Sequence, residues 1–351
     1  MAEILQPAGY AEYEDFIKSH PMGGITQSVL WHGVKNNWNH AVIVLRDDSG
    51  KIIGGVSVLI RKVPFFNMSL LYAPRGPVCD LYDREVMDGL MRGVDSLAKM
   101  YNAYAYKIDP DILESDARFL SLMRSMGFVQ IKGGDGFETI QARFNYRLYF
   151  KGRGEEEIFM SLAQKTRYNV RVAQKHGVGV KVAGKEALDD FIRIMKATGE
   201  RDGFSTRPKE YFERMMDELG EHCRLYMAYY EDMPIAGAVS TNYAGKTCYI
   251  YGASDNVHRN VMAPYLLQWE MIKWALETDC TVYDFQGVSG NLEDKNNPLY
   301  GLYRFKKGFN GTLDELCGEF DRMYRPFTAK LVDKAVDFSE WLRFIKRKLK
   351  R

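Results

Sequence analysis

The segment from Lys165 to Lys185 contains six Lys or Arg residues and no Asp or Glu. Within it, Arg167, Arg171 and Lys175 follow one another at four-residue spacing, which places their side chains on one face of a helix. Phosphates are contacted mainly by Lys and Arg, so such a face suits a polyanion such as a nucleic acid. We expect this face, including Lys165, to bind nucleic acid; an ordinary solvated helix face is the alternative.

Arg207 directly precedes Pro208, a residue typical of the first turn of a helix. A guanidinium group pairs with a phosphate through two hydrogen bonds, and the start of a helix adds positive potential. Arg207 is therefore a candidate phosphate ligand; the alternative is a loop arginine that is solvated or paired with Glu210. Lys35 lies in a predicted helix over 28–38 and taken alone would be a surface lysine.

The sequence contains no motif for a metal or an activated side-chain nucleophile. Its five cysteines include no C-x-x-C pair and its six histidines no H-E-x-x-H motif, so we expect neither a metal site nor a disulfide framework. No Ser-His-Asp or Cys-His arrangement is recognisable, and no cofactor is expected.

The chain of 351 residues is long enough for two domains of ordinary size. Hydrophobic residues make up 46% and charged residues 27%, the proportions of a soluble globular protein with a full core. The net charge of +2 excludes a uniformly basic nucleic-acid coat protein. No apolar stretch is long enough to span a membrane and the N-terminus has no signal pattern, so we predict a cytoplasmic protein.

An internal repeat organises the chain. IGGVS at 53–57 resembles IAGAV at 235–239, about 180 residues later. Each half has two helices, three strands, a long helix (84–100 and 263–278), another strand, a short helix and a final Gly-Phe strand. This order predicts an α/β protein with two tandem units of the GNAT acetyltransferase type. We place the units at 1–148 and 149–320, with a basic helical segment at 321–351 outside both.

The loop with which acyl-CoA enzymes of this fold bind pyrophosphate is missing from both halves. That loop reads R/Q-x-x-G-x-G/A, and its glycines let backbone N–H groups approach the phosphates. Residues 256–264 contain no glycine, and residues 81–90 place acids there. An acyl-CoA N-acyltransferase therefore remains only an alternative.

Five segments together resemble the FemABX peptidyltransferases, which use aminoacyl-tRNA to extend the peptide of a cell-wall precursor. The resemblance covers about residues 1–320, and the segments are QSVLWHGVKNNW (27–38), KTRYNVRVAQKHGV (165–178), RDGFSTRPKEYF (201–212), YIYGASD (249–255) and NPLYGLYRFKKGFNG (297–311). Some family members carry a long helical hairpin, whereas here a short loop joins the helices predicted at 187–199 and 208–219. The chain thus resembles the compact members.

The resemblance implies roles for several positions. In the family, a lysine and an arginine hold the diphosphate of the precursor, and Lys35 and Arg207 occupy these motif positions here. Trp38 and Tyr211 would also bind the precursor. The first unit is then the precursor side. The Phe305-Lys306 pair belongs to the second unit, which carries catalysis and tRNA binding. Lys306 would stabilise the oxyanion that forms when an amine attacks an ester, or bind the terminal ribose-phosphate of tRNA, and Phe305 would line that pocket.

Three further residues complete the candidate site. Tyr249 and Tyr251 alternate on a strand, so we expect both on one face, lining the peptide channel or merely packing. Asp109, at the end of a strand, is a candidate base for the attacking amine. Asp284, a water molecule or the substrate's own carboxylate could serve instead.

The function expected from this resemblance is transfer of an amino acid from aminoacyl-tRNA to the stem-peptide amine of a peptidoglycan precursor, linked to UDP or to lipid. Alternatives are acyl-CoA-dependent N-acylation and tRNA-dependent transfer to a peptide outside the cell wall. A non-catalytic nucleic-acid or membrane module is disfavoured by the near-neutral net charge. We expect a monomer.

The last residues, SEWLRFIKRKLKR, combine an apolar helical stripe with six Lys or Arg and no acid in 343–351. A basic amphipathic helix can lie on an anionic membrane, which would place the protein at the inner membrane face. Two alternatives stay open: peripheral membrane contact through 338–351, or packing of this helix on the first unit.

Overall fold

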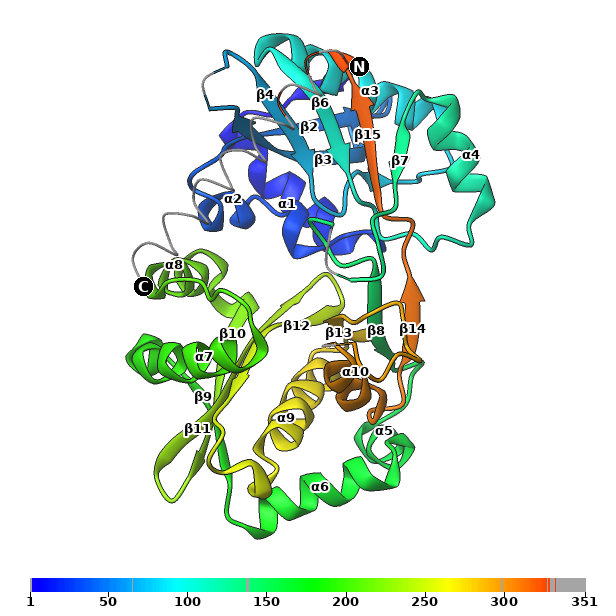
Figure 1. Ribbon diagram of the computed structural model, residues 1–351. Coiled ribbons are helices and arrows are strands. Elements are labelled where there is room, and N and C mark those ends of the chain that lie inside the picture. Colours follow the sequence, from blue (N-terminus) through cyan, green and yellow to red (C-terminus); the bar gives the residue numbers. More distant parts are fainter. Residues whose placement is uncertain are drawn as a thin grey trace.

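The computed structural model describes residues 2–64, 66–136, 139–297, 299–326, 328 and 332. They form two twisted β-sheets with helices on their faces, one above the other in Figure 1. The part nearer the N-terminus contains β1 (Ala2–Ile4), η1 (Pro7–Gly9), α1 (Tyr10–Ser19), η2 (Ile25–Gln27), α2 (Leu30–Val34), β2 (Asn39–Arg46), β3 (Ile52–Lys62), β4 (Ser69–Ala73), β5 (Val78–Cys79), α3 (Arg84–Met100), β6 (Ala103–Ile108), α4 (Ala117–Ser125) and β7 (Val129–Ile131).

The second half repeats this order. Its elements are β8 (Phe144–Tyr149), α5 (Glu155–Ser161), α6 (Gln164–Lys175), β9 (Gly179–Ala183), η3 (Lys185–Ala187), α7 (Leu188–Asp202), α8 (Lys209–Leu219), η4 (Gly220–His222), β10 (Cys223–Tyr230), β11 (Met233–Tyr243), β12 (Lys246–Ser254), η5 (Arg259–Val261), α9 (Ala263–Glu277), β13 (Val282–Gly287), α10 (Tyr300–Lys307), β14 (Thr312–Glu315) and β15 (Glu319–Met323).

The two sheets exchange one strand each. The eight-stranded sheet has the order β1-β2-β3-β4-β6-β15-β7, with β5 on β3, and the seven-stranded sheet has the order β14-β8-β13-β12-β11-β10-β9. Thus β8 lies between β13 and β14, whereas β15, orange in Figure 1, lies between β6 and β7. Each sheet also has one parallel pair, β4 with β6 and β12 with β13.

The exchange corrects the predicted unit boundaries. Residues 144–148, assigned to the first unit, belong to β8 in the second sheet, and residues 321–323, placed outside both units, belong to β15 in the first sheet. There Lys107 of β6 forms ion pairs with Glu319 (2.6 Å) and Asp321 (2.7 Å). The sequence near a strand does not show which sheet the strand joins, because strand pairing depends on contacts with neighbouring strands that can be far away in the sequence.

One hydrophobic cluster joins the two units. Tyr13 and Trp31 from the first unit pack with Phe191 and Phe212 from the second. Helix α2 packs against α8 in the same region. The units therefore share part of their core, and side chains of α2 and α8 are held close together.

Helix α2 is shorter than predicted. Of the range 28–38 only Leu30–Val34 is helical, and Lys35 is the C-cap residue rather than a mid-helix residue. The predicted membrane-binding segment 338–351 lies outside the described residues. Within the part of the chain that is described, no helix is long and apolar enough to cross a bilayer.

Candidate active site

Lys306 lies near the end of α10 and points into the protein, with 3% of its surface exposed. Its Nζ donates hydrogen bonds to the carbonyl oxygens of Gln286 (3.3 Å) and Gly287 (2.8 Å). Burial lowers the pKa of Lys306 to about 7, against the smaller opposing influence of the Asp284 carboxylate. Because burying a charge without an ion-pair partner is costly, this ammonium is suited to stabilise a negative charge that develops beside it.

The backbone at the end of β13 forms the receptor for Lys306. Gln286 has a φ of 62°, in the left-handed region, and its N–H donates to Asp284 Oδ1 at 2.6 Å. The β13–β8 register shifts between Asp284 and Gly287, and the carbonyls of Gln286 and Gly287 at this irregularity both accept from Lys306. Asp284, a candidate base from the sequence, is thus occupied as an acceptor at this turn.

Aromatic rings surround the Phe305-Lys306 pair. The Phe305 ring lies 5.0 Å from that of Tyr265 and 5.5 Å from that of Phe309. The Nζ of Lys306 lies 5.9 Å from the centre of the Tyr249 ring. Phe305 is half-buried, and the ring that the structure places near the Lys306 ammonium is that of Tyr249.

Tyr249 and Tyr251 do not share a face of their strand. A bulge in β12 places Val239 opposite Tyr251 but Ser240 opposite Tyr249, which leaves Ile250 without a partner. A bulge inserts one extra residue and so reverses the alternation of side chains. Tyr249 packs with the α9 side of the sheet near Lys306, whereas Tyr251 packs with α8, its hydroxyl 3.3 Å from that of Tyr211.

Three cations surround the ring of Tyr211 where α2 meets α8. Lys35 lies 5.6 Å from the ring centre, Arg207 5.5 Å and Arg214 5.9 Å. Burial, together with the charges of the two arginines, lowers the pKa of Lys35 to about 8. None of the three forms an ion pair with an acid in the described residues, so the alternative pairing of Arg207 with Glu210 is not formed. Such a cluster is suited to bind a diphosphate.

Sequence reasoning missed Arg214. It follows Tyr211 by three residues within α8, the spacing of one helix face, so this pattern was available in the sequence. Its side chain also donates to the carbonyl of Val34 at 3.3 Å, which links α8 to the end of α2.

The side chain of Tyr72 connects Asp109 to Trp38. The Asp109 carboxylate, 2% exposed, accepts from the hydroxyl of Tyr72 (2.6 Å) and the backbone N–H of Arg75 (2.7 Å). Trp38 lies 6.4 Å from Tyr72 by ring centroids. Burial raises the pKa of Asp109 to about 6, and the contacts with Arg75 and Tyr72 oppose that rise. Asp109 therefore lies in the first unit, on the Trp38 side of the candidate site, and no described contact joins it to Lys306.

The basic face of α6 is only partly open. Lys165, Arg171 and Lys175 are exposed, whereas Arg167 donates to the carbonyls of Met160 (2.8 Å) and Leu162 and so binds the end of α5. Arg167 is therefore a structural residue within the predicted nucleic-acid face.

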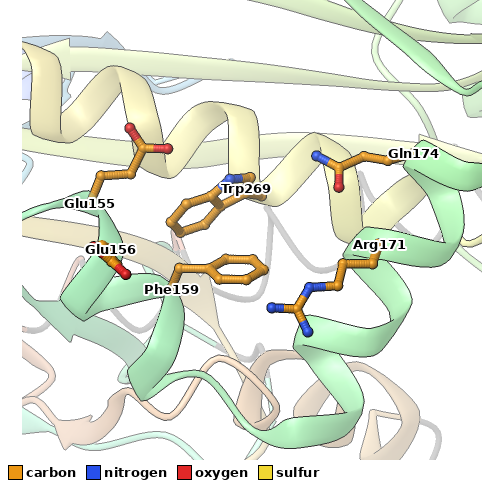
Figure 2. A pocket seen from close by; sticks show the side chains of 6 residues that line it. All are labelled: Glu155, Glu156, Phe159, Arg171, Gln174 and Trp269. Carbon is orange, nitrogen blue, oxygen red and sulfur yellow. The ribbon is translucent and has the colours of Figure 1, made fainter.

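A shallow hollow of about 460 Å³ lies between α5, α6 and α9 (Figure 2). Phe159 and Trp269 meet there at 4.8 Å, and the guanidinium of Arg171 lies 5.4 Å from the Phe159 ring. Glu155 and Glu156 of α5 line the opposite side of the hollow. The tertiary structure therefore brings two acids near α6, although the segment 165–185 contains no Asp or Glu. Tyr265, which contacts Phe305, lies one turn of α9 from Trp269.

An ion network connects the site to the first unit. Arg147 of β8 pairs with Asp284 (2.8 Å), Asp111 (2.8 Å) and Asp314 (3.4 Å), and all four side chains are largely buried. Asp111 follows β6 of the first unit, whereas Asp284 supports the turn that receives Lys306. The exchanged strand β8 thus places a cation between the two halves of the protein.

A sequence profile of the FemAB family matches residues 9–231 and 230–336, most of the chain. The chain belongs to the FemAB family. This confirms the resemblance found in the five segments.

Several FemAB relatives match over almost their whole length. The lipid II:glycine glycyltransferase of Staphylococcus epidermidis is 30% identical over 391 residues, 92% of this chain and 93% of that enzyme. The Staphylococcus aureus enzyme of the same name is 29% identical over 414 residues, 97% and 98% of the two chains. Both alignments exceed the 351 residues of this FemAB protein, which therefore lacks segments that the relatives have. Its α7 and α8 are joined by a short loop, as predicted. This FemAB protein is a transferase.

Solved structures support the same assignment. The crystal structure of FemX superposes with a TM-score of 0.87 at 26% identity, covering 94% of this FemAB protein and 99% of FemX. A tandem GNAT protein from the clavulanic acid biosynthesis pathway superposes with a TM-score of 0.55 at 10% identity, covering 92% and 98%. The predicted fold of two tandem GNAT-like units is confirmed.

Proposed function

We propose that this FemAB protein moves an amino acid from aminoacyl-tRNA to the stem-peptide amine of a peptidoglycan precursor and so builds an interpeptide bridge. The ester bond between the amino acid and the tRNA ribose breaks, an amide bond forms, and the ribose hydroxyl leaves with a proton. The names of the glycyltransferase relatives support a lipid-linked acceptor.

The observation that carries the proposal is the cation cluster around Tyr211. Lys35, Arg207 and Arg214 converge from two units on one ring without a described acid to neutralise them. A diphosphate supplies the missing negative charge and accepts several hydrogen bonds. Trp38, Tyr211 and Tyr251 would then contact the remainder of the acceptor.

The donor site in this proposal lies at Lys306. The buried ammonium stabilises the tetrahedral oxyanion more strongly than the ester, because the charge exists only in the transition state. The terminal base would stack near Phe305, whose ring lies 5.0 Å from that of Tyr265, and the Tyr249 ring lies 5.9 Å from Lys306 Nζ. Lys165, Arg171 and Lys175 contact the tRNA backbone, with Arg167 holding their helix in place.

Asp109 is the proposed proton acceptor. With its pKa raised to about 6, the carboxylate is ionised at neutral pH yet more basic than an exposed aspartate. An ionised carboxylate that accepts two hydrogen bonds keeps further lone pairs for an amine.

The test incubates the protein with a pool of radiolabelled aminoacyl-tRNAs and, separately, the UDP-linked and lipid-linked precursors. We expect label on a precursor with at least one tRNA. Acetyl-CoA serves as the competing donor. Acylation from acetyl-CoA, with none from tRNA, would establish the acyl-CoA alternative instead, and labelling of an unrelated peptide alone would remove the cell-wall acceptor.

A further inference from the structure

Two apolar side chains are exposed together at one end of the first unit. Phe66, in the connection between β3 and β4, is 38% exposed, and Met100, the last residue of α3, is 66% exposed. The two segments are joined, because the side chain of Asn102 donates to the carbonyl of Asn67 and the N–H of Ser69 to the carbonyl of Asn102. We call this surface the β3–β4 tip; it comprises Arg61, Lys62, Phe66, Lys99 and Met100.

The charge around the tip has one sign. Arg61, Lys62 and Lys99 are all exposed. The chain has no Asp or Glu from 49 to 79 or from 96 to 108, the two stretches that form the tip. The nearest acid on α3, Asp95, is already bonded to Arg322 (2.9 Å) and Tyr324 (2.7 Å). Exposed apolar groups within a basic rim match the interface of an anionic bilayer, where the apolar groups enter the headgroup region.

The last described residues pass the same end of the unit. The N–H groups of Tyr324 and Arg325 donate to the carbonyl of Tyr104, and Val332 is buried with Val63 and Met68. The described part of the chain therefore ends beside the β3–β4 tip, at Val332, and the sequence that follows has six Lys or Arg among its last nine residues.

The tip is also close to the cation cluster. The guanidinium of Arg61 lies 5.7 Å from the Trp38 ring, and Trp38 follows Lys35 by three residues. Residues 62–64, which continue from Arg61 toward Phe66, span about 10 Å when extended, so the tip reaches only a short distance beyond Arg61. Figure 1 shows the β3–β4 connection on the same side of the unit as α2. A surface in contact with the tip would thus lie near Trp38 and the proposed diphosphate ligands.

We propose that the β3–β4 tip docks on an anionic lipid bilayer, with Phe66 and Met100 inserted among the headgroups and Lys62 and Lys99 against their phosphates. Docking places the cation cluster at the height where the diphosphate of a lipid-linked acceptor emerges. This consequence rests on the proposed function, whereas docking itself does not.

The experiment measures binding of the full chain to vesicles of phosphatidylglycerol and phosphatidylcholine by co-sedimentation, with pure phosphatidylcholine vesicles as reference. We expect binding to the anionic vesicles and at least about tenfold weaker partitioning for Phe66→Ser/Met100→Ser, because two apolar contacts are lost. The matched control is Met160→Ser/Val257→Ser, two exposed apolar residues of the second unit, which should bind as the unchanged protein does.

The outcomes separate this inference from the proposed function. Unchanged vesicle binding by Phe66→Ser/Met100→Ser, or equal binding to neutral and anionic vesicles, overturns docking through the tip. Weakened binding by this variant supports docking even in a protein without aminoacyltransferase activity. If transfer does occur, the variant should lose rate with the lipid-linked acceptor in vesicles and keep it with the soluble UDP-linked acceptor.

Discussion

The ammonium nitrogen of Lys306 lies 2.8 Å from the carbonyl oxygen of Gly287, the last residue of β13. This hydrogen bond fixes the side chain of Lys306, near the end of α10, to the last residue of β13 in the second sheet. The carbonyl orients the ammonium without neutralising it, which leaves the charge available to a reacting group.

Replacing Lys306 with Met should lower kcat by about 100-fold or more, the effect of removing one oxyanion donor. The matched control is Lys307→Met, because Lys307 is the exposed neighbour on the same helix. Its rate should stay close to that of the unchanged enzyme. Single-turnover transfer from purified aminoacyl-tRNA measures both, and an unchanged rate for Lys306→Met would remove the proposed mechanism.

The same substitution should stabilise the protein. The pKa of Lys306 is about 7 in the folded state and 10.5 when exposed, so between these values the unfolded chain binds more protons and stability rises with pH. Lys306→Met removes this dependence and should gain about 1–4 kcal/mol at pH 6, where the buried charge is present. Urea unfolding at pH 6 and pH 9 tests this: the gain must shrink at the higher pH.

The pH profile of kcat/KM should be bell-shaped. Lys306 must be protonated, so activity falls as the pH rises through about 7, whereas Asp109 must be ionised, so activity rises through about 6. Asp109→Asn should lower the rate and abolish the acidic limb. A variant that keeps both limbs would show that another group accepts the proton.

Arg214→Ala and Arg207→Ala should each raise KM for the precursor by about tenfold and change kcat little, because a charge-assisted bond to phosphate is lost in substrate and transition state alike. Arg193→Ala is the control, since Arg193 lies exposed on α7 and pairs with Asp190. Steady-state kinetics with both substrates varied gives the answer. An effect confined to KM for tRNA would move the acceptor site elsewhere.

Arg147→Met should destabilise the protein by about 3–5 kcal/mol, because three buried carboxylates lose their common partner. Arg84→Ala breaks an exposed pair with Asp88 and should cost less than about 1 kcal/mol. Thermal unfolding compares the two. Equal, small losses would mean that the network does not hold the units together.

Local sequence patterns predicted most elements, apart from the length of α2, and failed for contacts between elements. The four-residue spacing in 165–175 predicted a helix, and α6 spans Gln164–Lys175. From this spacing, Arg167 and Arg171 were both predicted to bind nucleic acid. Arg167 binds carbonyls at the end of α5, and Arg171 lies over the ring of Phe159 of α5. Neither partner follows from helix periodicity.

The sequence by itself determined the order of elements in two similar halves and the candidate phosphate ligand Arg207 ahead of α8, because these depend on periodicity and residue chemistry over short stretches. The Phe305-Lys306 pair followed from the resemblance to a known family. Tertiary structure alone decided that β8 and β15 change sheets, that Tyr249 and Tyr251 face opposite sides, and that Lys35 joins Arg207 and Arg214. Each of these depends on pairing between distant segments. A strand accepts any partner that matches its edge, and a single bulge reverses every later side chain.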